Sequence, residues 1–173
     1  MLRDAAIFAA GLFAWTIVEY VIHGTLAHAH RTFVTERHMV HHRDPSAVFA
    51  IRLWPFVALL WIIGLVTWGF GGPMLFFNGL LFGFAAYEFV HYRIHFQIPA
   101  SDFEARLRAR HLAHHSGAPG AWFGVTSRLW DIVLGSEPEP SRRDALLARA
   151  ATIEPLTCPT NFSRITRWIA AWR

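Results

Sequence analysis

The sequence predicts an all-α integral membrane protein with about three transmembrane helices and a cytosolic helical cap. Hydrophobic residues make up 54% of the 173 residues and charged residues only 16%, whereas roughly a quarter of the residues of a soluble domain are charged. Two long stretches lack charged side chains, and ten of the eleven histidines fall into short groups at helical spacing. We therefore expect a bilayer to surround the apolar stretches and the histidines to lie together on one side of it.

The first apolar stretch, residues 5–18, is uncharged, and its apolar pattern continues past Glu19 to Ile22. A helix needs about 20 such residues to cross a bilayer. A cleavable signal peptide is the alternative, because Arg3 precedes the stretch and residues 27–29 have the small residues of a cleavage site. The stretch is longer than the apolar part of an ordinary signal peptide and contains a glutamate, so it predicts a retained membrane helix.

The second apolar stretch, residues 53–87, contains no charged residue. It is too long for one span and just long enough for two short ones, with a turn at residues 71–73, Gly-Gly-Pro. We expect a helical hairpin; a hairpin buried in a soluble bundle is the alternative. A hairpin returns the chain to the side that it left, so residues 31–52 and the chain from Arg93 onward share a side. Their arginines make that side cytoplasmic by the positive-inside rule.

A polar helix follows the hairpin. Residues 102–112 have the pattern of an amphipathic cytosolic helix, and we expect Arg106, Arg108 and Arg110 to point outward. The basic residues flank apolar stretches, so the net charge of +4 fits the cytoplasmic charge bias rather than binding to nucleic acid. All sixteen basic residues are arginine, which favours a GC-rich bacterial coding sequence and hence a bacterial inner membrane.

The C-terminal part is expected to be separate from the membrane-embedded part. Glutamate and proline alternate at residues 137–140 and interrupt helix formation. Beyond this break, Thr160 or Asn161 is expected to cap a final helix that lies on the bilayer through its aromatic residues. We thus predict a membrane-embedded domain of residues 1–136 and a tail of residues 137–173.

Four short groups of histidines carry the predicted chemistry. Positions i, i+3 and i+4 share one face of a helix, so the repeated His-x2-His-His motif directs three imidazoles the same way. A single histidine on an apolar face is usually an ordinary core residue, but ten in this grouping predict metal ligation. The predicted ligands are His23, His28, His38, His41, His42, His91, His95, His111, His114 and His115.

The pair His23 and His28 does not fit a regular helix. Residues five apart lie about 140° around an ideal helix, so either the helix is distorted there or the two histidines serve different metals. Glu19 lies four residues before His23, and Glu88 lies three before His91. We expect each carboxylate to accept the far N–H of its imidazole and so to fix the ring's orientation. For Glu19, an interfacial glutamate that reaches water is the alternative.

The available ligand types limit the choice of metal. Cys158 is the single cysteine, so no intramolecular disulfide and no thiolate cluster can form. A structural zinc takes four ligands and a hydrolytic zinc three, so ten histidines suffice for two metals with four or five ligands each. Imidazole suits iron as well as zinc and copper, and the spacing alone leaves iron and zinc open. Two irons in an all-nitrogen shell would support oxidation of a C–H bond.

The order His-x4-His, His-x2-His-His, His-x3-His, His-x2-His-His on and around membrane hairpins resembles the fatty acid hydroxylase superfamily of membrane di-iron oxygenases, which includes sterol desaturases. Three stretches are similar to its fatty acid 2-hydroxylase branch: residues 15–20, residues 87–88, and residues 124–127 together with residues 130–131. The likeness covers about residues 10–136. Glu88 stands where that branch tends to have aspartate. Carotenoid hydroxylases have four residues within the third pair, where this chain has three.

This resemblance implies O2-dependent hydroxylation of a lipid acyl chain at the carbon beside the carbonyl, with two iron ions held by the ten histidines and zinc as a substitute metal. It also implies an external electron donor of the cytochrome b5 or ferredoxin type. The alternatives are a sterol- or carotenoid-type hydroxylase or desaturase, a membrane metal- or haem-binding protein without oxygenase activity, and a catalytically silent interaction protein. The aromatic residues expected along an acyl path are Trp54, Phe56, Trp61, Phe76 and Phe77.

Overall fold

The structure, a computed structural model, describes residues 1–157. Helix α1 continues directly into a wider helical segment, η1, and the remaining helices follow in chain order. The elements are α1 (Leu2–Tyr20), η1 (Val21–Ala29), α2 (Phe33–Arg43), η2 (Ile51–Leu53), α3 (Trp54–Trp68), α4 (Gly72–Phe96), α5 (Asp102–Ser116), α6 (Leu129–Val133) and α7 (Pro140–Ala151). No strand occurs among these residues, so the predicted all-α fold is confirmed.

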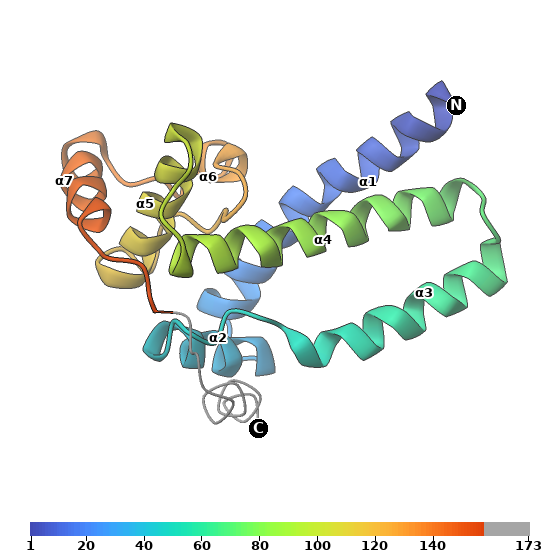
Figure 1. The fold of residues 1–173 in the computed structure, drawn as a ribbon, viewed down its shortest axis with the longest axis horizontal. Helices are drawn as coiled ribbons and strands as arrows, with labels where there is room; N and C mark the ends of the chain where they lie inside the picture. The colour runs from blue at the N-terminus through green and yellow to red at the C-terminus, as the bar shows by residue number, and fades with distance from the viewer. Residues whose placement is uncertain (158–173) are drawn as a thin grey trace.

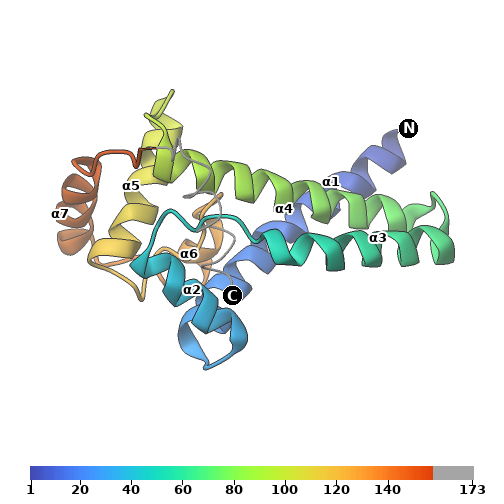
Figure 2. The same cartoon turned by 60° about the horizontal axis from the view of Figure 1, so that its bottom comes forward.

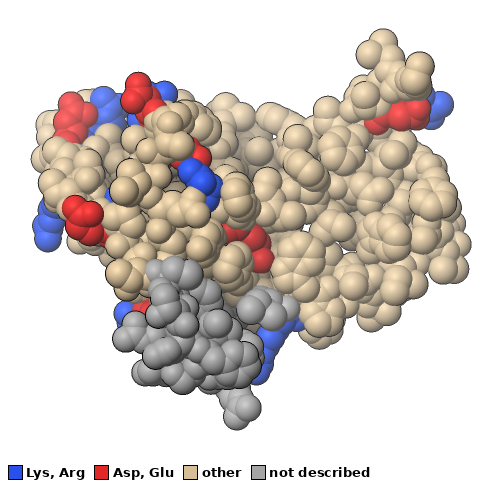
Figure 3. Space-filling view, in the orientation of Figure 1, with Lys and Arg blue, Asp and Glu red and all other residues tan. Residues whose placement is uncertain are grey.

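The molecule has an elongated part and a cap (Figure 1). Helices α1, α3 and α4 extend to one side, and α2, α5, α6 and α7, which we call the cap, gather at the other end. A second view shows the same arrangement, with α3 running beside α4 (Figure 2). On the face shown in Figure 3, the elongated part is almost free of charged side chains except near the N-terminus, whereas the cap carries both signs of charge. This distribution suits a membrane around the elongated part.

Two helical stretches, Leu2–Ala29 and Gly72–Phe96, are long and apolar enough to cross a membrane. In their apolar windows only 17% and 28% of the residues are buried, so neither resembles a core helix of a soluble bundle, the alternative considered for the hairpin. Helix α3 has 15 residues, about 22 Å of helix, against a hydrocarbon core of about 30 Å. The expected three membrane helices are therefore two of spanning length and one shorter apolar helix.

The predicted hairpin connects α3 to α4. Helix α3 ends at Trp68, and Gly69 has a φ of 57°, a conformation that glycine adopts most readily. Helix α4 starts at Gly72 with a proline in its first turn. Proline is tolerated there because N–H groups of the first turn have no acceptor within the helix. The turn thus lies at residues 69–71, slightly before its predicted place.

Helices α1 and α4 pack with their backbones almost in contact. A Cβ atom added at Gly79 would lie 2.1 Å from the carbonyl oxygen of Phe8, and one added at Gly11 would lie 2.0 Å from that of Phe76. Space therefore requires glycine at both positions, as at other close contacts between membrane helices. Because α4 and the extension of α1 carry four of the predicted ligands, this contact also sets the distance between those histidines.

The hydrophobic core cluster of the described residues lies where the cap meets the end of α4. Leu112 of α5 packs with Trp122 and Val125 of the following loop, and all three are nearly inaccessible. Ala150 of α7 is fully buried in the same core. The first part of the expected tail is thus packed on α5, and the domain division at residue 136 stays a prediction. The expected final helix lies outside the described residues.

The predicted orientation of two arginines on α5 is wrong. Arg106 is exposed as expected, but Arg108 and Arg110 are only 6% and 9% exposed. Both α4 and α7 pack against α5. More than one face of α5 is therefore covered, and the amphipathic pattern alone did not show which side chains the second contact would bury.

Replacing Gly79 by alanine should push α1 away from α4. The added methyl group has no space against the α1 backbone, and overpacking of this kind costs about 1–3 kcal/mol. We expect a lower thermal unfolding midpoint than for Gly120→Ala, because no described atom lies within 4 Å of a Cβ at Gly120. Equal midpoints in the same detergent would show that the two backbones do not approach this closely.

Candidate metal centre

The structure gathers the ten predicted ligands into two groups of five. Within each group the ring nitrogens that could bind an ion lie within 4.8 Å of one another. His30, the eleventh histidine, belongs to neither group. Group 1 consists of His23, His28, His38, His42 and His114, and group 2 of His41, His91, His95, His111 and His115.

The two copies of the His-x2-His-His motif divide their ligands between the groups. On α2 the outer two histidines, His38 and His42, belong to group 1, and the middle one, His41, belongs to group 2. On α5 the assignment is reversed, and the middle histidine, His114, belongs to group 1. Positions i and i+4 lie one above the other on a helix, whereas i+3 is displaced around the axis. Each motif therefore supplies two histidines to one group and one to the other.

His23 and His28 share group 1 because the helix is distorted between them. Val21–Ala29 forms a π-helix, in which backbone hydrogen bonds join residues five apart. The N–H of His30 accordingly donates to the carbonyl oxygen of Thr25, with an N···O distance of 3.1 Å. The wider winding brings residues i and i+5 onto one face. Of the two explanations that the spacing left open, the structure shows the distorted helix.

The spacing of the ring nitrogens fits a metal ion. Neighbouring Nε2 atoms are 2.8–3.1 Å apart in group 1 and 3.0 Å apart in group 2. Two nitrogen ligands about 2.1 Å from an ion are about 3.0 Å apart at a right angle and about 3.4 Å apart at the tetrahedral angle. The observed spacing therefore fits a five- or six-coordinate ion better than a closed tetrahedral zinc site.

The histidines of α2 and α5 are held in the neutral form. Burial, reinforced by neighbouring imidazoles, lowers the pKa of His38 to about 2 and that of His42 to about 4. The same causes lower the pKa of His41 and His111 well below the usual value. At neutral pH these rings keep the lone pairs that bind metals. Converging lone pairs repel one another unless a cation lies among them, so each group can hold a metal ion.

Backbone carbonyls orient two rings of group 1. Nδ1 of His23 lies 2.6 Å from the carbonyl oxygen of Phe123, and Nδ1 of His114 lies 2.8 Å from that of Ala121. A carbonyl oxygen can only accept, so Nδ1 carries the hydrogen and Nε2 remains available for a metal. The segment of residues 121–123 therefore sets the tautomer of two candidate ligands.

Glu19 has different partners from the one expected. It is 3% exposed and accepts hydrogen bonds from the backbone N–H groups of Val125 (2.5 Å) and Thr126 (2.9 Å), whereas His23 donates to Phe123. The helix widens after Tyr20, so the residue four positions on no longer lies directly above the carboxylate. Glu19 thus holds the loop that orients His23 instead of contacting the imidazole.

Glu88 also binds backbone rather than a histidine. Its carboxylate accepts hydrogen bonds from the N–H of Ala50 (2.6 Å) and from the ring N–H of Trp54 (3.0 Å). These bonds hold the segment before α3 against α4. The ring of His91 instead stacks on Tyr87, with 5.5 Å between centroids. A part for either glutamate in a reaction stays a prediction.

Asp131 is a supporting residue to which the sequence analysis gave no role. It is fully buried and accepts hydrogen bonds from the N–H groups of Phe123 (2.8 Å) and Gly124 (3.0 Å) and from the hydroxyl of Ser136 (2.6 Å). Burial raises its pKa. Asp131 and Glu19 thus hold the same short loop from two sides. The sequence marked Asp131 as part of a family-like stretch, but nothing in its spacing identified these partners.

The sequence model of the fatty acid hydroxylase family matches residues 8–136, a range that contains all ten histidines of the two groups. The chain belongs to this family. The likeness to a fatty acid hydroxylase that the histidine pattern predicted is therefore confirmed.

Several curated relatives are 2-hydroxylases or ceramide hydroxylases. A dihydroceramide fatty acyl 2-hydroxylase of Arabidopsis thaliana is 34% identical over 74% of this chain and 59% of its own length. The ceramide very long chain fatty acid hydroxylase of Saccharomyces cerevisiae is 32% identical over 75% of this chain and 37% of its own length. The fatty acid 2-hydroxylase of Homo sapiens is 30% identical over 72% of this chain and 37% of its own length. The chain thus spans less than two thirds of these relatives. No solved structure matches it.

In this member of the fatty acid hydroxylase family, a cavity of about 450 Å³ lies beside both histidine groups. His23 and His38 of group 1 and His41 and His91 of group 2 line it, and most of the other lining side chains are apolar. Its volume lies in the range of small-molecule sites. Phe56 is the one aromatic residue of the expected acyl path that lines it. The cavity is the candidate substrate site.

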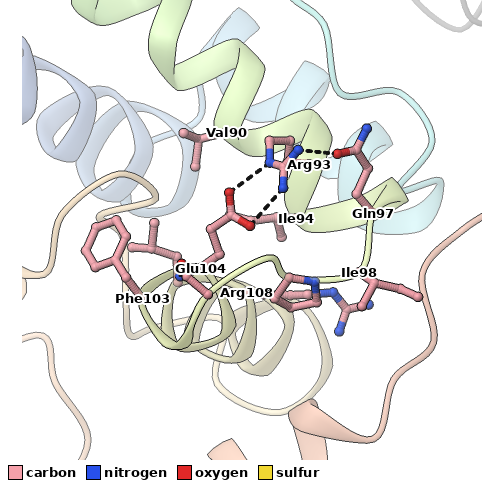
Figure 4. A pocket seen from close by; sticks show the side chains of 11 residues that line it. Val90, Arg93, Ile94, Gln97, Ile98, Phe103, Glu104 and Arg108 are labelled. Carbon is pink, nitrogen blue, oxygen red and sulfur yellow. Dashed lines mark hydrogen bonds and ion pairs between the residues drawn. The ribbon is translucent and has the colours of Figure 1, made fainter.

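A smaller cavity of about 200 Å³ lies between the end of α4 and α5 (Figure 4). Arg93 and Glu104 form an ion pair there with an N···O distance of 2.8 Å, and Arg93 also donates to Gln97. None of the ten histidines lines this cavity. It therefore belongs to the contact between α4 and α5 rather than to the candidate metal centre.

Removing one histidine from each group should separate the two metal positions. His42→Ala should weaken binding in group 1 and His41→Ala in group 2, because each loses one of five donors. We expect dialysis against a chelator to remove about half of the bound metal from either variant before the unchanged protein loses any. Metal analysis measures this, with His30→Ala as the control. Identical loss curves for all four proteins would contradict two separate positions.

Asp131→Asn should loosen the loop that orients His23 and His114. The asparagine amide replaces one accepting carboxylate oxygen by an NH2 group, which would face the N–H and O–H donors that now bind Asp131. Leaving a buried donor unpaired lowers the free energy of unfolding by about 1–3 kcal/mol. We expect a lower unfolding midpoint and faster metal loss. Asp144→Asn is the matched control, because the Asp144 side chain is 81% exposed. Metal retention equal to that of the control would show that Asp131 does not support the site.

Proposed function

We propose that the protein hydroxylates an acyl chain with O2 at two iron ions, one held by each histidine group. The observation that carries this proposal is the apolar cavity, which touches histidines of both groups. Membership of the fatty acid hydroxylase family supports an acyl substrate. The names of the relatives, fatty acyl and fatty acid 2-hydroxylases, favour the carbon beside the carbonyl as the position oxidised.

Bound iron would supply the redox chemistry: one atom of O2 enters a C–H bond and the other leaves as water, with two electrons and two protons from an external donor of the cytochrome b5 or ferredoxin type. Imidazole donors suit iron, and zinc could occupy the same positions without redox activity. The protein itself orients the ligands through the carbonyls of Ala121 and Phe123. Apolar side chains such as Phe84 exclude water from the cavity beside them.

The proposed setting is the cytoplasmic side of a bacterial inner membrane. The cap and both histidine groups lie at one end of the elongated part (Figure 1). The arginines after residue 30 all lie in residues 31–52 or from residue 93 onward, the two segments that flank the apolar hairpin. Their excess on one side favours the cytoplasm. A soluble electron donor would then approach the cap, while the acyl substrate would come from the bilayer.

Two proposals of another class fit the geometry less well. A haem iron takes its axial ligands from the two sides of a flat porphyrin, but five ring nitrogens lie within 4.8 Å of one another in each group and leave no space for one. Transport sites generally lie near the middle of the membrane. Both histidine groups instead lie where α4 and η1 meet α2 and α5.

Lipid analysis of a bacterial host tests the proposed function. Cells that produce the protein should accumulate hydroxy fatty acids that contain one atom from labelled O2, and His111→Ala should abolish this product because it removes a donor of group 2. The His111→Ala protein must be present in the membrane at a similar level. A metal-loaded wild-type protein that yields no O2-dependent product from any host lipid would contradict the oxygenase proposal.

A further inference from the structure

We infer that the large cavity binds an acyl chain whose head is a free carboxylate, and that Arg37 and Arg52 hold this head. The inference rests on the proposed function and names its substrate class. It starts from the charged residues among the cavity's lining, which are two glutamates and two arginines: Glu19, Glu88, Arg37 and Arg52.

The two glutamates are already satisfied by the protein. Glu19 accepts hydrogen bonds from Val125 and Thr126, and Glu88 accepts them from Ala50 and Trp54. Neither carboxylate forms an ion pair with an arginine of the cavity. Their carboxylate oxygens thus accept hydrogen bonds from backbone N–H groups and from a ring N–H, and not from an arginine.

The two arginines have no such partner. Among the described residues, neither Arg37 nor Arg52 forms a hydrogen bond or an ion pair. Arg37 is half-buried and Arg52 is exposed, and both line the cavity. A guanidinium group binds a carboxylate through two parallel hydrogen bonds. Two unpaired guanidinium groups beside an apolar cavity therefore suit a ligand with a long apolar chain and an anionic head.

The position of Arg37 also determines which carbon approaches the metals. Arg37 immediately precedes His38 of group 1 and lies four residues before His41 of group 2, and all three line the cavity. Residues four apart on a helix are neighbours, with about 5–6 Å between their Cβ atoms. A carboxylate held by Arg37 would thus place the first carbons of the chain beside the two groups. Its far end would extend along Phe56 and Phe84.

This geometry gives a physical reason for oxidation next to the carboxyl group. If the head were bound far from the histidines, the chain would present its middle or its methyl end to them. A neutral amide head, as in a ceramide, would leave two guanidinium groups unpaired. The competing explanation is that both arginines contact phospholipid phosphates at the membrane surface. In that case they would not distinguish between ligands that differ in head charge.

Binding of palmitate and palmitamide to the purified, metal-loaded full chain in detergent tests the inference, because the two probes share a chain and differ in head charge. We expect the wild-type protein to prefer palmitate. Arg37→Gln should weaken palmitate binding about tenfold, the scale of one charge-assisted hydrogen bond, and leave palmitamide binding unchanged. Arg37→Lys, which keeps the charge, should retain most of the preference.

Arg43→Gln is the matched control, since Arg43 is an exposed arginine at the end of the same helix and does not line the cavity. It should behave like the wild type with both probes. Equal wild-type affinity for the two probes, or an equal loss of both in Arg37→Gln, would overturn the inference. Arg52→Gln provides a second variant should Arg37→Gln fail to fold, and the same two outcomes apply to it.

The binding experiment and the activity experiment can fail separately. A protein that prefers palmitate through Arg37 but forms no O2-dependent product would refute the proposed oxygenase and leave the head-group site standing. A protein that hydroxylates lipids but binds both probes equally would refute the head-group site and leave the proposed oxygenase standing. In an active protein, Arg37→Gln should also raise the KM for palmitate and lower the fraction of product hydroxylated beside the carboxyl group.

Discussion

The convergence of ten imidazoles on two points is the constraint on which the rest of the structure depends. Each His-x2-His-His motif serves both groups, so α2 and α5 cannot move apart without breaking both. His42 and His115, from different groups, stack with their ring centroids 4.2 Å apart. Neutral, buried imidazoles have their lone pairs directed at one another, an arrangement that a bound cation would stabilise. A metal ion bound in either group would therefore also stabilise the docking of the cap.

A short loop connects helices α1 and α6 to the imidazoles through hydrogen bonds. Residues 121–126 present carbonyls to two rings, and Glu19 of α1 and Asp131 of α6 bind the backbone N–H groups of the same loop. The N–H groups of the loop therefore bind the two carboxylates, while its carbonyl groups bind the two imidazoles. The costly burial of Glu19 near the membrane is offset by three donors on one loop. This explains why a carboxylate occurs there without touching an imidazole.

The sequence predicted those features that follow from local spacing. Uncharged stretches and the Gly-Gly-Pro turn indicated the hairpin, and the i, i+3, i+4 spacing indicated imidazoles on common faces. The partition into two groups could not be predicted, because it depends on how α2 and α5 face each other. The π-helix at Val21–Ala29 was one of two outcomes compatible with the same spacing. The partners of Glu19 and the burial of Arg108 depend on segments distant in sequence, which periodicity does not place.

The two sides of the candidate metal centre differ in a way that suits oxidation of a lipid. His23, His38, His41 and His91 line the large cavity, whereas His95, His111 and His114 do not line it and are at most 2% exposed. His111 and His114 of α5 are thus buried within the two groups, whereas the apolar cavity opens on these groups beside residues of α1, α3 and α4. A ligand in this cavity contacts histidines of both groups. An apolar approach excludes water from the reacting centre and so favours the C–H bond of a chain as the group oxidised.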